Sequence, residues 1–127
     1  MLQGIHPLLT GELLLHLDAM GHSDSVVVAD AHFPAAALGA RVVVLPGSST
    51  PEVLAAIRTV IPLDLDVQRE LMDAAGTTPT TTRFIDRFAY YDAARAAFLI
   101  VRTGETRKYG NALLRKGVVG HESVGAM

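Results

Sequence analysis

Short runs of aliphatic and β-branched residues alternate along this chain with longer segments of helical apolar spacing. Buried strands are predicted at residues 26–29, 41–45 and 98–101, because each is a compact apolar run bounded by turn-forming residues. Helices are predicted at residues 11–20, 51–61 and 87–97, where apolar residues recur every three or four positions. Strands and helices that alternate at short spacing favour an α/β fold with a mostly parallel sheet flanked by helices.

The starts of the predicted helices carry capping residues. Thr10 is expected to cap the first helix, and Gly21 suits the position just past its end. Thr50 is expected to cap the second helix, with Pro51 at its first position. Asp86 is expected to cap the third helix.

The remaining segments are shorter or irregular. Residues 63–67 alternate apolar and acidic side chains, which is typical of an edge strand, and a last strand is predicted around residues 112–114. Phe33-Pro34 interrupts regular structure. Residues 76–82 are rich in threonine and are expected to form an exposed loop, and the tail at 120–127 is expected to fray.

The size and apolar content of the chain indicate one domain that self-associates. A length of 127 residues suits a single domain, 1–127. Half of the residues are hydrophobic and the mean hydropathy is +0.31, which is high for a small soluble domain. Excess apolar surface usually marks contact sites, so a homo-oligomer is expected.

Charge and cysteine usage exclude several classes of protein. The net charge of −2 without a dense basic block argues against a nucleic-acid partner. The absence of cysteine excludes disulfides, thiol nucleophiles and thiolate metal sites. No secretory signal and no apolar run long enough for a membrane helix is found, so a soluble, cytoplasmic protein without a membrane partner is expected.

Three places combine reactive side chains with strand ends or turns. His22 lies in the turn between the first predicted helix and the first strand. Asp30, with His32 two residues later, directly follows that strand, and ligands of open α/β sheets bind beyond the carboxyl ends of strands. The tripeptide Tyr109-Gly110-Asn111 combines a phenol, a flexible glycine and an amide that both donates and accepts hydrogen bonds.

Each of these places also has a structural interpretation. A histidine after a helix can simply interact with the helix dipole, and an aspartate after a strand commonly caps a turn. A zinc site of His22, Asp30 and His32 lacks the fixed helical spacing of a specific zinc motif. Gly104 and Gly110 form no nucleotide-binding pattern, so neither a metal nor a cofactor is expected.

A series of motifs in one order carries a resemblance that covers most of the chain. The motifs are Met20-Gly21-His22, Asp30-Ala31-His32-Phe33-Pro34, Arg87-Phe88-Ala89-Tyr90-Tyr91, Thr103-Gly104-Glu105, Lys108-Tyr109-Gly110-Asn111 and Lys116-Gly117. Together they resemble the RbsD/FucU family of ribose pyranases and L-fucose mutarotases, and the Met-Gly-His and Arg-Phe-Ala-Tyr-Tyr segments resemble the L-fucose mutarotase branch. The stretch between Leu63 and Arg83 looks shorter than in that branch.

The resemblance implies an RbsD-like fold and an isomerase that interconverts the α and β anomers of a free sugar, L-fucose above all, without a cofactor. It implies His22 as the proton donor and Asp30 and Arg87 as substrate-binding residues, with Tyr109, Gly110 and Asn111 lining the sugar site. We take His22, Asp30 and Tyr109 as the catalytic candidates. The family also implies a ring-shaped homo-oligomer, commonly a decamer, with sites near subunit boundaries.

Three other functions stay open at this point. Ribose pyranase activity, which interconverts pyranose and furanose rings, would use the same acid and base groups. A sugar-binding module without catalysis would bind the monosaccharide but leave anomeric exchange unchanged. An oligomeric scaffold would bind no sugar.

Overall fold

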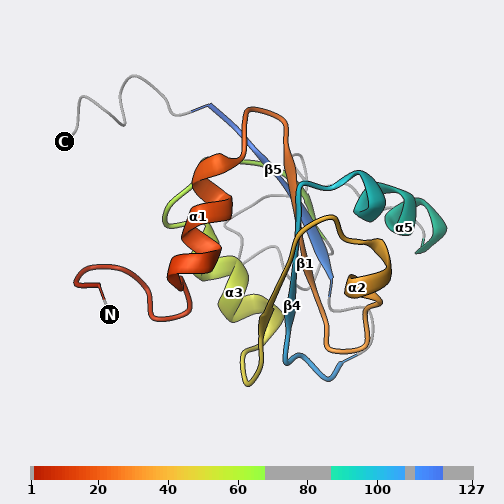
Figure 1. Cartoon of the computed structure of the whole chain (residues 1–127), viewed down its shortest axis with the longest axis horizontal. Coiled ribbons are helices and arrows are strands. Elements are labelled where there is room, and N and C mark those ends of the chain that lie inside the picture. The colour runs from red at the N-terminus through yellow and green to blue at the C-terminus, as the bar shows by residue number, and fades with distance from the viewer. Residues whose placement is uncertain (1, 68–86, 108–110, 119–127) are drawn as a thin grey trace.

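A five-stranded sheet forms the centre of the computed structural model, which describes residues 2–67, 87–107 and 111–118. The strand order is β2-β4-β1-β5-β3 (Figure 1). The strands are β1 (Ser25–Ala29), β2 (Val42–Leu45), β3 (Leu63–Val67), β4 (Leu99–Thr103) and β5 (Ala112–Lys116). The described helices are α1 (Gly11–Ala19), α2 (Ala35–Leu38), α3 (Thr50–Ile57) and α5 (Arg87–Ala96).

The sheet is mostly parallel, as the sequence predicted. Strand β4 pairs in parallel with both β1 and β2, whereas β5 pairs antiparallel with β1 and β3. Of the five strands in the described part of the chain, four therefore run in one direction and β5 opposes them. The apolar-acidic strand β3 lies at one edge, where its alternation indicated it would be.

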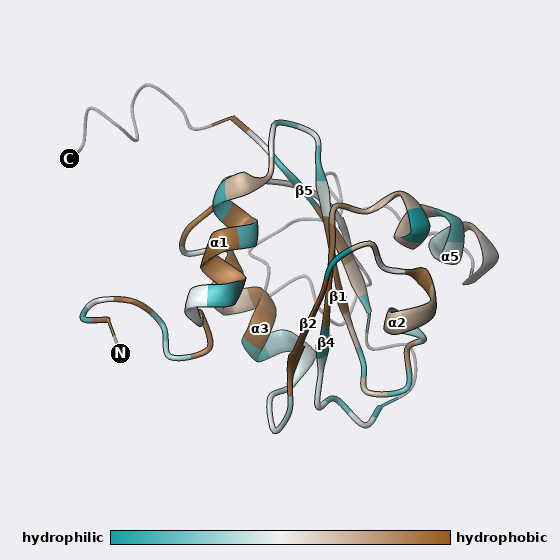
Figure 2. Cartoon of the chain, in the orientation of Figure 1, coloured by the Kyte–Doolittle hydropathy of each residue, from teal (hydrophilic) through white to brown (hydrophobic). Residues whose placement is uncertain are grey.

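Helices cover both faces of the sheet (Figure 1): α1 and α3 lie on one side, and α2 and α5 on the other. Alternate residues of β1 point to opposite faces, so Val26 and Val28 join the core under α1 and α3, while Val27 and Ala29 join the core under α2 and α5. All four are fully buried. The hydropathy colouring shows the same apolar centre along β1, β2 and β4 (Figure 2).

The helix caps are partly as predicted. Thr10 Oγ1 accepts a hydrogen bond from the backbone N–H of Leu13, so Thr10 caps α1. The prediction for Thr50 was wrong: Ser49 is the N-cap of α3, and Thr50 is its first residue. The reason is a capping box, in which Ser49 and Glu52 each accept a hydrogen bond from the other's backbone N–H.

Several boundaries differ from the sequence prediction. Residues between β1 and Ala35 are irregular, as the Phe33-Pro34 pair indicated, but the short helix α2 that follows was not predicted. Strand β4 continues to Thr103 and β5 to Lys116, because both extend along the buried ladder of β1. The predicted cap Asp86, the threonine-rich loop and the tail at 120–127 lie outside the described residues. Within the described part of the chain, no helix has the length and apolarity needed to span a membrane.

Candidate active site

Asp30 and Asn111 meet at the carboxyl end of β1. Asp30 directly follows Ala29, and Asn111 directly precedes Ala112, which is paired with Val28 in the antiparallel β1–β5 ladder. The backbone N–H of Asp30 donates to Oδ1 of Asn111 at 2.7 Å. Because a backbone N–H only donates, this bond fixes the orientation of the amide and turns the Nδ2 donors of Asn111 away from that N–H. The structure therefore brings together one predicted pair.

The Asp30 side chain forms a turn with His32. Asp30 is only 4% exposed, and its Oδ1 accepts a hydrogen bond from the backbone N–H of His32 at 2.9 Å. The His32 ring is exposed, and its Nε2 lies 3.1 Å from the carbonyl oxygen of Thr106. A carbonyl only accepts, so Nε2 carries the proton and Nδ1 of neutral His32 is an acceptor.

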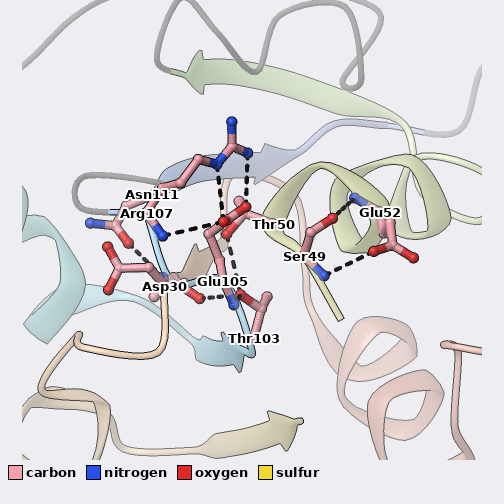
Figure 3. A network of polar contacts seen from close by, with 9 residues as sticks. Asp30, Ser49, Thr50, Glu52, Thr103, Glu105, Arg107 and Asn111 are labelled. Carbon is pink, nitrogen blue, oxygen red and sulfur yellow. Dashed lines mark hydrogen bonds and ion pairs between the residues drawn. The ribbon is translucent and has the colours of Figure 1, made fainter. Parts of the chain in front are cut away.

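A polar network from the end of β4 holds this turn in place (Figure 3). Thr103 Oγ1 donates to the carbonyl of Ala29 at 2.9 Å and lies 3.1 Å from the backbone N–H of Glu105, which donates to it. The carbonyl of Glu105 in turn accepts from the backbone N–H of Ala31 at 2.8 Å. The residues on both sides of Asp30 are therefore hydrogen-bonded to the end of β4 and the residues just after it.

Glu105 anchors that segment to the start of α3. Its carboxylate accepts two hydrogen bonds from the Arg107 guanidinium, from Nε at 3.0 Å and Nη2 at 2.8 Å, and another from the backbone N–H of Thr50. These contacts, chiefly the Arg107 side chain, lower the pKa of Glu105 to about 2. Gly104 allows the approach, because a Cβ there would lie 2.7 Å from the backbone nitrogen of Gly47. Glu105 therefore stays ionised near neutral pH.

Tyr90 reaches the same region from α5. Its side chain is buried beside Phe33, and burial together with the negative charge of Asp30 raises the pKa of the phenol well above 10. Within the described residues the Tyr90 hydroxyl is buried without a hydrogen-bond partner. A buried donor left unpaired costs about 1–3 kcal/mol. The sequence predicted no role for Tyr90 or Glu105, because Tyr90 packs on a distant turn and Glu105 joins Arg107 to the distant residues Ala31 and Thr50.

His22 lies at the opposite end of β1 from Asp30. It is exposed in the turn between α1 and β1, whereas Asp30 follows the last residue of the same five-residue strand. Such a strand spans about 16 Å. One chain therefore does not bring His22 to Asp30, although both were predicted as parts of one site.

The His22 turn is held firmly by β5. The backbone N–H of Ser23, which has a φ of 72°, donates to the carbonyl of Lys116 at 2.8 Å. The Nζ of Lys116 donates to the carbonyls of Leu17 and Met20, both at 2.8 Å. It thus provides partners for backbone carbonyls that the end of α1 would leave unpaired. The imidazole of His22 is thus presented to the outside from a constrained turn.

The other predicted site residues are only partly described. Arg87 is the first residue of α5. Tyr109 and Gly110 lie outside the described residues. Among the residues that the structure describes, no group of three or more His, Asp and Glu side chains is arranged to hold a metal ion.

Comparison with known proteins places this geometry in a family. Residues 3–119 match the model of the RbsD / FucU transport protein family. An L-fucose mutarotase of Glaesserella parasuis serovar 5 is 40% identical, over 93% of this chain and 96% of that protein. The alignment runs over 141 positions, more than this chain contains, so that relative carries residues that this chain lacks.

Solved structures agree with the sequence comparison. The fucose mutarotase of Streptococcus pneumoniae, solved in complex with L-fucose, superposes with a TM-score of 0.86 at 31% identity, over 94% of this chain and all of that one. RbsD of Bacillus subtilis, complexed with D-ribose, superposes with a TM-score of 0.72 at 19% identity, over 91% of this chain and 98% of that one, and shares the fold.

Proposed function

The chain belongs to the RbsD/FucU family, and we therefore propose that it is an isomerase that interconverts the α and β anomers of a free monosaccharide, with L-fucose as its substrate. The observation that carries the proposal is the Asp30–Asn111 pair at the carboxyl end of β1. A carboxylate that accepts and an amide that donates suit the hydroxyl groups of a sugar. The L-fucose complex of the similar Streptococcus pneumoniae enzyme supports this choice of sugar.

The chemistry breaks the bond between the anomeric carbon and the ring oxygen, lets the aldehyde rotate and re-forms the bond, and the protein need supply only proton transfers. One group removes the proton of the anomeric hydroxyl while another protonates the ring oxygen, and the open aldehyde then closes on its other face. Histidine suits this work, because its ordinary pKa near 6.5 lets it donate or accept a proton at neutral pH. We assign His22 as the main acid and base and Asp30 as its partner, with Tyr109 as a second proton relay. Arg87, Gly110 and Asn111 complete the sugar site, and no cofactor takes part.

A complete site then needs two copies of the chain. His22 and Asp30 lie at opposite ends of β1, about 16 Å apart along the strand, so a neighbouring copy must supply one of them. The exposed side chains of Leu2, Leu15 and Val118, each at least 65% accessible, support burial between copies. The assembly we propose is a ring-shaped homo-oligomer, a decamer as in the family, and the absence of cysteine supports a cytoplasmic location.

Anomeric exchange measured by saturation-transfer NMR tests the proposal. Wild-type protein should accelerate exchange between the anomers of L-fucose more than those of galactose or rhamnose. Asp30→Asn should lose the acceleration while keeping the local structure, because Asn retains the acceptor for the His32 N–H but not the negative charge. Faster pyranose–furanose exchange of ribose alone would instead assign ribose pyranase activity. Binding without faster exchange of any sugar would show that the protein is a sugar-binding module without catalysis.

A further inference from the structure

Tyr90 of α5 packs directly against the turn that contains Asp30. Its ring meets the ring of Phe33 edge-to-face, with centroids 6.0 Å apart and an interplanar angle of 84°. Phe33 follows Asp30 by three residues and its backbone N–H donates to the carbonyl of Asp30 at 3.3 Å. Tyr90 therefore packs with Ala29 and Phe33, the residues that flank the Asp30 turn, on the α2 and α5 face of the sheet.

The Tyr90 hydroxyl lacks a hydrogen-bond partner in a region where the neighbouring polar groups have theirs. Around Asp30, the backbone N–H of Asp30 and the side chains of Thr103 and Glu105 all have hydrogen-bond partners. The Tyr90 hydroxyl is buried and has none among the described residues. Buried polar groups in native proteins nearly always form a hydrogen bond, either within the protein or with a bound molecule. The hydroxyl is thus available to bind a ligand.

The protonation state makes this hydroxyl a donor. Burial and the nearby charge of Asp30 raise the pKa of the phenol, so Tyr90 keeps its proton at neutral pH. Asp30 beside it offers an acceptor. A sugar hydroxyl, which both accepts and donates, can satisfy the two groups together.

We propose that the Tyr90 hydroxyl is a further substrate-binding group, which donates a hydrogen bond to a sugar hydroxyl held by Asp30. The inference rests on the proposed mutarotase function and adds a specificity-determining residue to it. Asp30 and Tyr90 are 4% and 8% exposed, so both side chains are shielded from solvent, where a hydrogen bond to a ligand meets little competition from water. A site that hydrogen-bonds a particular hydroxyl discriminates strongly against analogues that lack it.

The test compares Tyr90→Phe with Tyr91→Phe. Tyr91 also meets Phe33 edge-to-face, at 5.8 Å, so the control removes a hydroxyl from the same helix and the same aromatic contact. Tyr90→Phe should weaken L-fucose binding about tenfold. Its melting temperature should be unchanged or higher, because an unpaired polar group has been removed. Tyr91→Phe should bind the sugar as wild type does.

Deoxy analogues of L-fucose identify the sugar hydroxyl concerned. One analogue should bind wild type about tenfold more weakly than L-fucose, but should bind Tyr90→Phe as well as L-fucose does. Wild-type affinity and exchange rate in Tyr90→Phe would overturn the inference. A wild-type protein that binds and exchanges no sugar would instead overturn the proposed function, so the two failures are distinguishable.

Discussion

The backbone N–H of Asp30 donates to Oδ1 of Asn111 at 2.7 Å, which joins two residues 81 positions apart in the chain. The bond exists because the β1–β5 ladder pairs Val28, two residues before Asp30, with Ala112, the residue after Asn111. It orients the amide of Asn111 so that a donor remains for a ligand. The pairing of β1 with β5 therefore determines that Asn111 offers a hydrogen-bond donor, and not its acceptor, to a ligand.

Asn111→Asp tests whether sugar binding needs the donor of the Asn111 amide or only a side chain of that size. The variant keeps an acceptor for the Asp30 N–H, but it replaces the Nδ2 donors with a second acceptor and adds a negative charge near Asp30. We expect sugar affinity to fall at least about tenfold, as for a lost hydrogen bond to a ligand. Titration calorimetry with L-fucose measures this, and unchanged affinity would contradict the proposed role of the amide.

His22→Ala should remove most catalysis while leaving the fold intact. The side chain is exposed, so its removal creates no cavity. Positioned proton transfer contributes about 10²–10⁴-fold, and exchange should fall by a factor in that range. Saturation-transfer NMR gives the rate and a melting curve checks the fold, with exposed His6→Ala as the control. Exchange as fast as in wild type would refute the role.

Glu105→Gln should alter the acid stability of the protein. The folded-state pKa of Glu105 is about 2, below its ordinary 4.5. Its stabilising contribution is therefore fully present above pH 4.5 and is lost as the pH falls toward 2. The variant should be less stable at neutral pH by about 1–2 kcal/mol, a discounted figure because the side chain of Arg107 is 63% exposed.

The measurement is urea unfolding of wild type and variant between pH 2 and pH 7. The stability difference should shrink as the pH falls from about 4.5 toward 2, where wild-type Glu105 becomes protonated. Glu52→Gln is the matched control, since Glu52 caps the same helix from an exposed position. A Glu105→Gln difference that stays constant over this pH range would contradict the assigned ion pair.

Lys116→Met should loosen the turn that presents His22. The variant removes both hydrogen bonds from Nζ to the carbonyls of Leu17 and Met20, and we expect a loss of stability of about 1–2 kcal/mol. Exchange should slow severalfold, while sugar affinity changes little because Asp30 lies at the other end of β1. Lys116→Arg, which retains donors, should recover part of the rate. An unchanged rate in Lys116→Met would show that the turn needs no such support.

The strands were largely predictable from the sequence, whereas the separation of His22 from Asp30 within one chain was not predicted, although their positions on either side of β1 imply it. The run at residues 26–29 is a continuous apolar segment because β1 is buried on both faces, and residues on either side of a strand lie at its two ends. The cap of α3 was misplaced by one residue, because Thr50 and Ser49 are both common capping residues and only Glu52 distinguishes them.

The supports of the site could not be predicted from local patterns. Glu105 receives hydrogen bonds from Arg107 and Thr50, and the second of these depends on the loops after β2 and β4 meeting at Gly47 and Gly104. In the sequence, Tyr90 was only one residue of the Arg-Phe-Ala-Tyr-Tyr motif and had no role of its own. Only the packing of α5 beside the Asp30 turn shows that its hydroxyl lies near a carboxylate.

Mixing two inactive variants tests the account most directly, because it asks whether His22 of one copy works with Asp30 of another. His22→Ala and Asp30→Asn would each be purified, then unfolded, mixed in equal amounts and refolded together, with L-fucose exchange followed by saturation-transfer NMR. Random assembly leaves both wild-type residues in about a quarter of the shared sites, so about a quarter of wild-type activity should return. A refolded mixture no faster than either variant alone would contradict a site shared between copies.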